Sequence, residues 1–267
     1  MPSYVITGAS RGIGLEFVRQ LSQDQNNIVF GLCRNPQRAT KLLDLQKGSS
    51  NIHVIKADLD DVRSLEAAAT EVAKVTGGSL DYLINNGAYT AVEHASLNIT
   101  QFPDAKSLED DLIAAFRTNV VGVAHTINAF LPLLRKSAVK KVITLSTGLA
   151  ATDVILGSDF NINPQYPVSK AAVNMLVAQY AVSLRDEGFT FLAISPGVVN
   201  TAEKPPTPEE IEGFKAMVKQ FQKYAPDWDG VPLTPETSVT LMRDVIAKAG
   251  PKDTGAFVSH FGNQKWL

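Results

Sequence analysis

The chain has 267 residues, of which 45% are hydrophobic and 19% charged, and its formal net charge is -2. This composition suits a folded α/β domain and excludes extensive disorder, and the charge argues against a nucleic acid or a membrane as partner. No stretch is long and apolar enough to predict a membrane span, and the opening MPSYVITGAS does not predict a signal peptide. Because Cys33 is the single cysteine, the chain cannot form an internal disulfide, and we expect a cytoplasmic location.

Short apolar runs alternate with stretches of helical periodicity along the chain. The apolar runs predict strands at residues 4–8, 27–33, 52–58, 81–86, 141–146, 189–197 and 255–259. The periodic stretches predict helices at 13–23, 38–46, 62–77, 107–137 and 166–188; the fourth has a polar beginning that we expect to be loop and a candidate kink at Pro132. This alternation predicts one α/β domain over residues 1–267, a doubly wound parallel sheet of about seven strands with helices on both faces.

One segment, residues 198–235, interrupts the pattern. It is rich in proline and charge around a helical centre, and it follows the sixth strand. Ligands of such sheets bind beyond the carboxyl ends of the strands, so the segment is predicted to cover a site as a lid. A solvated excursion without a role is the alternative.

A glycine-rich turn, TGASRGIG at residues 7–14, follows the first strand and opens a helix. Glycines at 8, 12 and 14 let a pyrophosphate approach the backbone, and the helix start presents N–H groups and a positive dipole end to it. In this strand–turn–helix context the motif predicts a dinucleotide site rather than a tight turn without a ligand.

The second strand ends in GLCRNP, without the acid that would bond the ribose 2′-OH of NAD. Arg34 stands there instead, and Arg11 lies inside the glycine turn, so two guanidinium groups could bind the 2′-phosphate of NADP(H). For Arg34 alone, a solvated surface position is the alternative. Asp58, at the end of the third strand, is expected at the adenine edge, and Asn85 and Asn86 either close the floor beneath the adenosine or only form a turn.

Three polar residues follow the later strands. Ser146 ends the fifth strand, and Tyr166 and Lys170 share a face at the start of the next helix because they are four residues apart. The lysine cation and an oxidised nicotinamide would both lower the pKa of Tyr166. Tyr166 could then give a proton to a carbonyl oxygen that Ser146 also bonds. For the tyrosine–lysine pair alone, an ordinary helical surface is the alternative.

These motifs in this order resemble the short-chain dehydrogenase/reductase family over nearly the whole chain: TGASRGIG at 7–14, Asp58, NN at 85–86, Asn119, Ser146, YPVSK at 166–170 and SPGVVNT at 195–201. The resemblance implies a Rossmann-fold, NAD(P)-dependent oxidoreductase with Tyr166 as acid/base and Lys170 as the partner that lowers its pKa. It further implies that Ser146 orients the substrate and that Asn119 holds a water in a proton relay. The endings CRNP and GAFVSHFGNQKWL are similar, more weakly, to fungal norsolorinic-acid-type ketoreductases and small carbonyl reductases.

The glycine turn and the resemblance together give a set of expected NADP(H)-binding residues, with 196–201 at the nicotinamide. The set is Gly8, Ser10, Arg11, Gly12, Ile13, Gly14, Arg34, Asn35, Asp58, Leu59, Asn85, Asn86, Gly87, Asn119, Tyr166, Lys170, Pro196, Gly197, Val199 and Thr201. The family's NNAG is NNGA here, with Gly87 and Ala88 exchanged, so the path of that turn is open.

The segment between Ser146 and Tyr166 is longer than the family usually has. Residues 148–165 are therefore expected to form a pocket wall specific to this protein. The substrate-contacting candidates are Thr147, Gly148, Asp153 and Phe160. For Asp153 and Phe160, a role as loop anchors is equally open.

The sequence thus predicts reduction of a ketone or aldehyde by NADPH, with a small-molecule carbonyl compound as partner. Oxidation of a secondary alcohol, a non-catalytic NADP-binding sensor and a non-redox member of the family are the alternatives. Relatives assemble through the helices that bear Asn119 and Tyr166, so a homodimer or homotetramer is expected, although the apolar run at 173–182 also suits a core. No metal site is predicted, because the histidines are scattered: His53, His94, His125 and His260.

Overall fold

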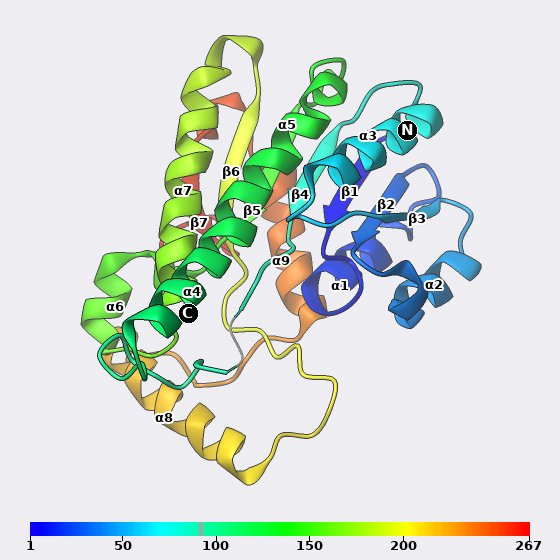
Figure 1. The fold of residues 1–267 in the computed structure, drawn as a ribbon. Coiled ribbons are helices and arrows are strands. Elements are labelled where there is room, and N and C mark those ends of the chain that lie inside the picture. The colour runs from blue at the N-terminus through cyan, green and yellow to red at the C-terminus, as the bar shows by residue number, and fades with distance from the viewer. Residues whose placement is uncertain (91–92) are drawn as a thin grey trace.

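The computed structural model describes residues 1–90 and 93–267 (Figure 1). Its strands form one parallel sheet in the order β3-β2-β1-β4-β5-β6-β7. They are β1 (Ser3–Thr7), β2 (Ile28–Cys33), β3 (Ile52–Lys56), β4 (Tyr82–Asn85), β5 (Lys141–Leu145), β6 (Thr190–Ser195) and β7 (Ala256–Ser259). The predicted doubly wound α/β fold with seven strands is confirmed.

The helices of the described ranges cover both faces of this sheet. They are α1 (Gly12–Leu21), α2 (Thr40–Lys47), α3 (Val62–Thr76), α4 (Ala105–Phe116), α5 (Gly122–Leu134), α6 (Thr152–Ser158), α7 (Gln165–Ser183), α8 (Pro208–Tyr224) and α9 (Pro235–Lys248). Over these described residues, we find no helix with the length and apolarity that a membrane crossing requires.

Successive residues of the strands supply two separate cores. Val5 of β1 belongs to a cluster with the buried faces of α3, α5 and α7, whereas its neighbour Ile6 belongs to a cluster with α1, α2 and α9. This follows from the two-residue period of a strand, which sends neighbouring side chains to opposite faces.

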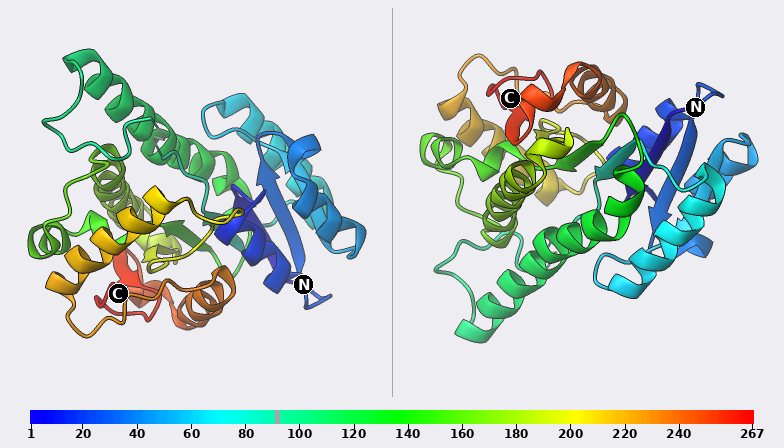
Figure 2. Two further views of the ribbon diagram at one scale, coloured as in Figure 1. Left: turned by 90° about the horizontal axis from the view of Figure 1, so that it is seen from below. Right: turned by 90° about the horizontal axis from the view of Figure 1, so that it is seen from above.

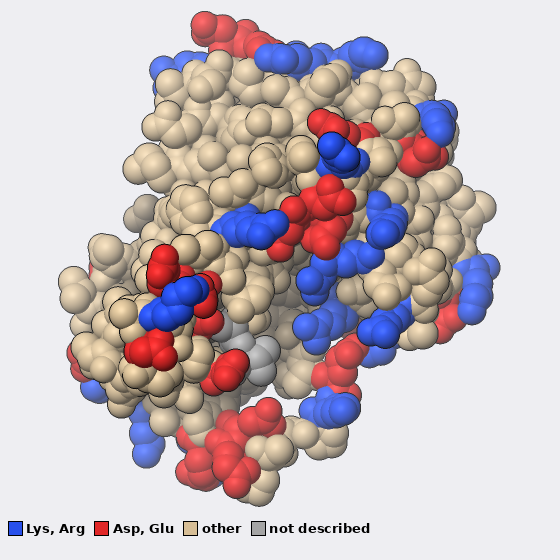
Figure 3. All heavy atoms as spheres, in the orientation of Figure 1, with Lys and Arg blue, Asp and Glu red and all other residues tan. Residues whose placement is uncertain are grey.

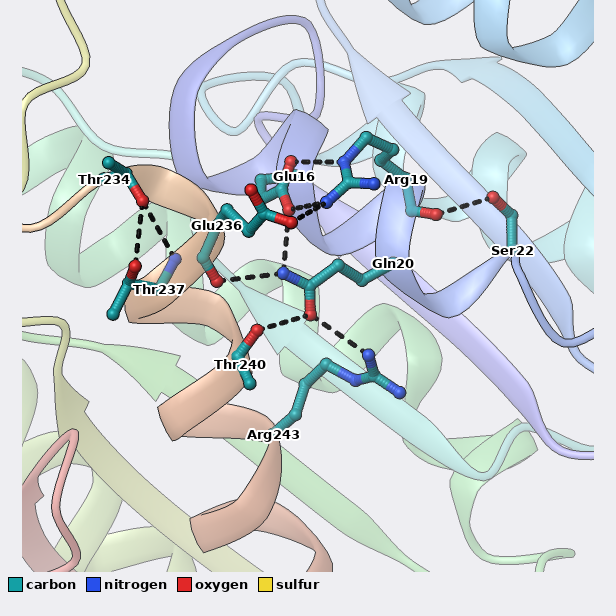
Figure 4. A network of polar contacts seen from close by, with 9 residues as sticks. All are labelled: Glu16, Arg19, Gln20, Ser22, Thr234, Glu236, Thr237, Thr240 and Arg243. Atoms are coloured by element: carbon teal, nitrogen blue, oxygen red, sulfur yellow. Dashed lines mark hydrogen bonds and ion pairs between the residues drawn. The ribbon is translucent and has the colours of Figure 1, made fainter.

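A polar network joins α1 to α9 (Figure 4). The amide of Gln20 donates to Glu16 Oε1 at 2.7 Å and to the carbonyl of Glu236 at 3.0 Å, and its oxygen accepts from Thr240 and Arg243. Gln20 is buried, so these bonds satisfy an otherwise costly polar group. Because α1 carries the glycine turn at its start, the network fixes the helix that would face a dinucleotide.

The predicted helix at 107–137 differs from the structure in two ways. Its polar beginning is helical, because α4 starts at Ala105 with Asp104 as an N-cap whose side chain accepts from the Ser107 N–H at 2.7 Å. The helix is also interrupted by one π-helical turn at Arg117–Val121, which separates α4 from α5. Pro132 lies inside α5, two residues before its end.

Two helices were not predicted. The segment 148–165, expected to be loop, contains α6. The helix α9 was not assigned, although Thr234 caps it by accepting from the Thr237 N–H at 3.1 Å and Pro235 occupies its first position. This Thr-Pro-Glu beginning is a helix-start signal that the sequence offers.

Candidate active site

A cavity of about 700 Å³ lies at the carboxyl edge of the sheet. Figure 3 shows basic side chains gathered beside the hollow on the α1–α2 side and acidic ones over α8. Of the expected NADP(H)-binding residues, those that line the cavity are Gly8, Ser10, Arg11, Gly12, Ile13, Arg34, Asp58, Leu59, Asn86, Gly87 and Thr201. Further lining residues that sequence reasoning missed come from the β3–α3 connection, the turn after β4, α4 and the π-helical turn, and include Asp60, Tyr89, Asp110, Ile113, Arg117 and Thr118.

The glycine turn is packed against the turn after β4. A Cβ atom at Gly8 would lie 2.6 Å from the Cα of Gly87, and one at Gly14 would lie 2.4 Å from the Gly8 carbonyl oxygen. The N–H groups of Asn86 and Gly87 both donate to Thr7 Oγ1 at 3.0 Å. The exchanged order NNGA therefore places its glycine at the point of close approach to Gly8.

The start of α1 has the features of an anion site. Arg11 is the N-cap in an extended conformation, its side chain caps no N–H, and the first turn of α1 contains no acid. The first N–H groups of a helix have no partner within it, so they can bond a phosphate. The segment after β6 runs to the start of α1 (Figure 2). Its residue Thr201 has side-chain atoms 3.4 Å from the position of a Cβ at Gly12. The residues present thus fit a dinucleotide pyrophosphate.

Several expected cofactor residues lie outside the lining of this cavity. Asn85 does not line the cavity; it is buried, donates to Thr144 Oγ1 at 3.3 Å and leaves its Oδ1 without a partner in the described ranges. Asn35 does not line the cavity either. In the segment after β6, the Pro196 carbonyl accepts from Ser238 at 2.7 Å and Val199 pairs with Leu233. Gly197 has φ +81° and abuts the His260 ring.

Tyr166, Lys170 and Ser146 lie at the junction of β5 and α7. Lys170 is buried, its Nζ donates to the Leu145 carbonyl at 2.7 Å, and it lies 5.8 Å from the centre of the Tyr166 ring. Ser146 is also buried, and its hydroxyl donates to Asn174 Oδ1 at 2.7 Å. Asn174 was not predicted, although it stands four residues after Lys170 and so shares its face of the helix.

Asn119 lies in the π-helical turn. Its Oδ1 accepts from the Tyr89 N–H at 2.7 Å, and its Nδ2 donates to the Tyr89 carbonyl at 3.0 Å and to Ser169 Oγ at 2.9 Å. Both amide protons are therefore used, and one lone pair of Oδ1 remains for a further partner. The side chain ties the turn after β4 to α7, the helix that carries Tyr166.

Burial sets the ionisation of the tyrosine and the lysine. It raises the pKa of Tyr166 to about 12, and it lowers the pKa of Lys170 to about 8. In the chain itself the Tyr166 pKa therefore shifts upward, opposite to the expected lowering by Lys170, because burial removes the phenolate from water. The phenol stays protonated at neutral pH.

These shifts predict how stability depends on pH. Between the folded pKa of Lys170, about 8, and its ordinary pKa of 10.5, the unfolded chain binds a proton that the folded chain has lost. The free energy of unfolding should therefore rise with pH through this window relative to that of Lys170→Met. Urea denaturation of both proteins at several pH values measures the difference, and a difference that stays constant would show that the lysine pKa is not lowered.

The four substrate-contacting candidates are mostly engaged in packing. Asp153 accepts from the Tyr224 hydroxyl at 2.9 Å, and Phe160 is buried 5.4 Å from Phe221, so both anchor α6 to α8. Thr147 accepts from the Leu149 N–H at 3.3 Å. A Cβ at Gly148 would lie 2.7 Å from Trp266 Cβ, so the C-terminal segment packs against the chain just after Ser146.

The helical centre of residues 198–235 is α8, which lies with α6 at the carboxyl side of the sheet (Figure 1). Thr207 and Glu210 form a capping box at its start. Its other end is held to α6 by an ion pair of Lys223 with Asp159 at 2.7 Å and by the packing of Phe221 between Phe160 and Trp228. The C-terminal end of α8 thus packs against the segment 148–165 through specific side-chain contacts.

We expect Phe221→Ala to weaken the packing of α8 on the segment 148–165. The substitution removes a buried ring, which should lower the free energy for local opening of α8 by roughly 3 kcal/mol. Hydrogen exchange of the α8 amides would then be about a hundredfold faster, while most of the sheet keeps its protection. Hydrogen–deuterium exchange read by mass spectrometry measures this. Ile211→Ala, at an exposed position of the same helix, should leave the exchange unchanged; equal effects of the two variants would contradict the packing role.

Comparison with known proteins agrees with this geometry. A family model described as short chain dehydrogenase matches residues 3–211. The chain is 42% identical to the short chain dehydrogenase virK of Hypocrea virens and 44% identical to the short-chain dehydrogenase/reductase AacuF of Aspergillus aculeatus, over 100% of each chain in both cases.

Solved structures are also similar to this chain, including two carbonyl reductases that match over 98% of both chains. The NADPH-bound carbonyl reductase from chicken fatty liver has a TM-score of 0.79 at 28% identity. The carbonyl reductase Sniffer of D. melanogaster has a TM-score of 0.79 at 27% identity. The sequence match and the shared fold lead to one assignment: this chain is a member of the short-chain dehydrogenase family.

Proposed function

We propose that this protein reduces a ketone or aldehyde carbonyl to an alcohol with NADPH. The observation that carries the proposal is the buried Lys170 at the β5–α7 junction, which bonds the carbonyl of the residue before Ser146 and lies 5.8 Å from the centre of the Tyr166 ring. The family membership supports an oxidoreductase. The similar chicken protein, an NADPH-bound carbonyl reductase, supports both the cofactor and the reaction.

Arg11 and Arg34 both line the cavity and would hold the 2′-phosphate, and the start of α1 would hold the pyrophosphate. NADPH bound by these residues would supply the hydride for the carbonyl carbon. Tyr166 gives its proton to the carbonyl oxygen, where negative charge develops. Ser146 bonds the same oxygen, so that two fixed donors meet the charge. The proton lost from Tyr166 is replaced along Lys170 and a water that Asn119 helps to hold.

Tyr166 is in the protonated form that carbonyl reduction requires. Donation needs the phenol, which is the form that a pKa of about 12 keeps populated at neutral pH. Oxidation needs the phenolate, which is scarce there unless a positively charged cofactor lowers the pKa. A sensor without catalysis would not need a buried lysine beside the tyrosine.

We infer that the protein acts in the cytoplasm and assembles as a homodimer or homotetramer. On α7, Val173 and Val177 face the core, whereas Met175 and Val182 are 62% and 60% exposed. Apolar residues are also exposed on α4, with Phe116 at 47%. An apolar strip across these helices suits burial against a second copy.

The proposal is tested by titrating the protein with NADPH and NADH, and then following absorbance of the nicotinamide with a panel of ketones, quinones and aldehydes. Binding of NADPH and turnover of a carbonyl compound are expected. Failure to bind either nucleotide would overturn the assignment of the cavity. Binding of the nucleotide with oxidation of secondary alcohols by NADP+ that is much faster than reduction of the matching carbonyls by NADPH would favour the oxidative alternative.

A further inference from the structure

Three polar residues of α7 stand at intervals of four: Tyr166, Lys170 and Asn174. On a helix this spacing places them on one face in successive turns. Lys170 and Asn174 both bond the end of β5. The Lys170 Nζ donates to the Leu145 carbonyl at 2.7 Å, and Asn174 Oδ1 accepts from the Ser146 hydroxyl at 2.7 Å. Two consecutive residues of the strand end are thus attached to two consecutive turns of the helix.

Ser146 has little else to fix its hydroxyl. Its backbone N–H donates to the Ile194 carbonyl at 2.8 Å, which holds the main chain but leaves rotation about the side-chain bond free. A serine hydroxyl has one proton, and in the structure that proton is donated to Asn174. Ser146 cannot give the same proton to a carbonyl oxygen while that bond persists.

We propose that Asn174 is a positioning residue for Ser146, an inference that rests on the proposed function. A carboxamide can accept through Oδ1 or donate through Nδ2 after turning about its terminal bond. With Nδ2 donating to Ser146 Oγ, the serine proton is released toward the substrate oxygen. Asn174 thereby holds the hydroxyl in place in both states, and it lies one turn behind Lys170 and need not touch the substrate.

The test is a double-mutant cycle with Ser146→Ala. Asn174→Leu removes both hydrogen-bonding groups while keeping a similar side-chain volume. Asn174→Ala is measured as well, because its smaller side chain cannot clash with neighbouring atoms. In either variant kcat should fall about tenfold, the size of one well-placed hydrogen bond, while the Kd for NADPH stays within about twofold of the wild type. Ser146→Ala should lose about a hundredfold. Adding the Asn174 substitution to Ser146→Ala should then cost less than about twofold, because the residue it positions is gone.

Gln179→Ala, at an exposed position of the same helix, is the matched control and should keep full turnover. Wild-type kcat in both Asn174 variants would overturn the inference. An equal loss with and without Ser146 would also overturn it, since the effect would then be a general disturbance of the helix. The wild type separates the two claims: if it reduces no carbonyl compound with NADPH, the proposed function falls and the inference with it, and if it is active while the Asn174 variants are unaffected, only the inference falls.

Discussion

Tyr166→Phe should lower kcat by about a thousandfold or more and leave NADPH binding within about twofold of the wild type. The substitution removes only the hydroxyl, which is the proton donor placed beside Lys170 at the β5–α7 junction. The ring keeps its volume and its partly buried position, so folding should be preserved. Steady-state rates on any carbonyl compound that the wild type reduces, together with fluorescence titration of NADPH, measure both quantities.

Tyr180→Phe is the matched control for this experiment. It removes a hydroxyl from the same helix, one that lies 2.8 Å from Asn128 Oδ1 and 3.2 Å from the Ala124 carbonyl and can donate its proton to either, far along the chain from the junction. Its kcat should be that of the wild type. If Tyr166→Phe also turned over at the wild-type rate, the proton would have to come from another group and the mechanism would be wrong.

The second large effect is expected at the other end of the site. Replacing both Arg11 and Arg34 by Ala should raise the KM for NADPH by roughly a hundredfold or more and change the KM for NADH little. Both guanidinium groups line the cavity, and charge-assisted bonds to a 2′-phosphate exist only with NADPH. The ratio of kcat/KM for the two nucleotides measures the preference.

A control pair of the same charge change is Arg63→Ala with Arg185→Ala, both exposed and outside the cavity lining. It should leave the nucleotide preference intact, because surface charges at a distance are screened by salt. If the Arg11 and Arg34 double variant kept its preference for NADPH, the 2′-phosphate would be bound elsewhere, with Arg117 as the other guanidinium that lines the cavity.

Local features of the chain were sufficient to predict the strands, the glycine turn and the placement of Tyr166 beside Lys170. Alternating apolar runs and helical periods predict a parallel doubly wound sheet, because few connections between such elements are sterically allowed. The turn at 7–14 can be predicted from the sequence because the strand–turn–helix order brings the backbone into close contacts there, and only glycine fits such contacts. The tyrosine and lysine are four residues apart on one helix, so their shared face follows from helical geometry alone.

The tertiary structure decided what depends on residues distant in the sequence. The bond between Ser146 and Asn174, the seat of Phe160 on Phe221 and the packing of Trp266 behind Gly148 each join separate segments, and no local pattern encodes them. The sign of the Tyr166 pKa shift is of the same kind. The sequence shows the lysine that would lower it, but the burial that raises it is a sum over many neighbours contributed by the whole fold.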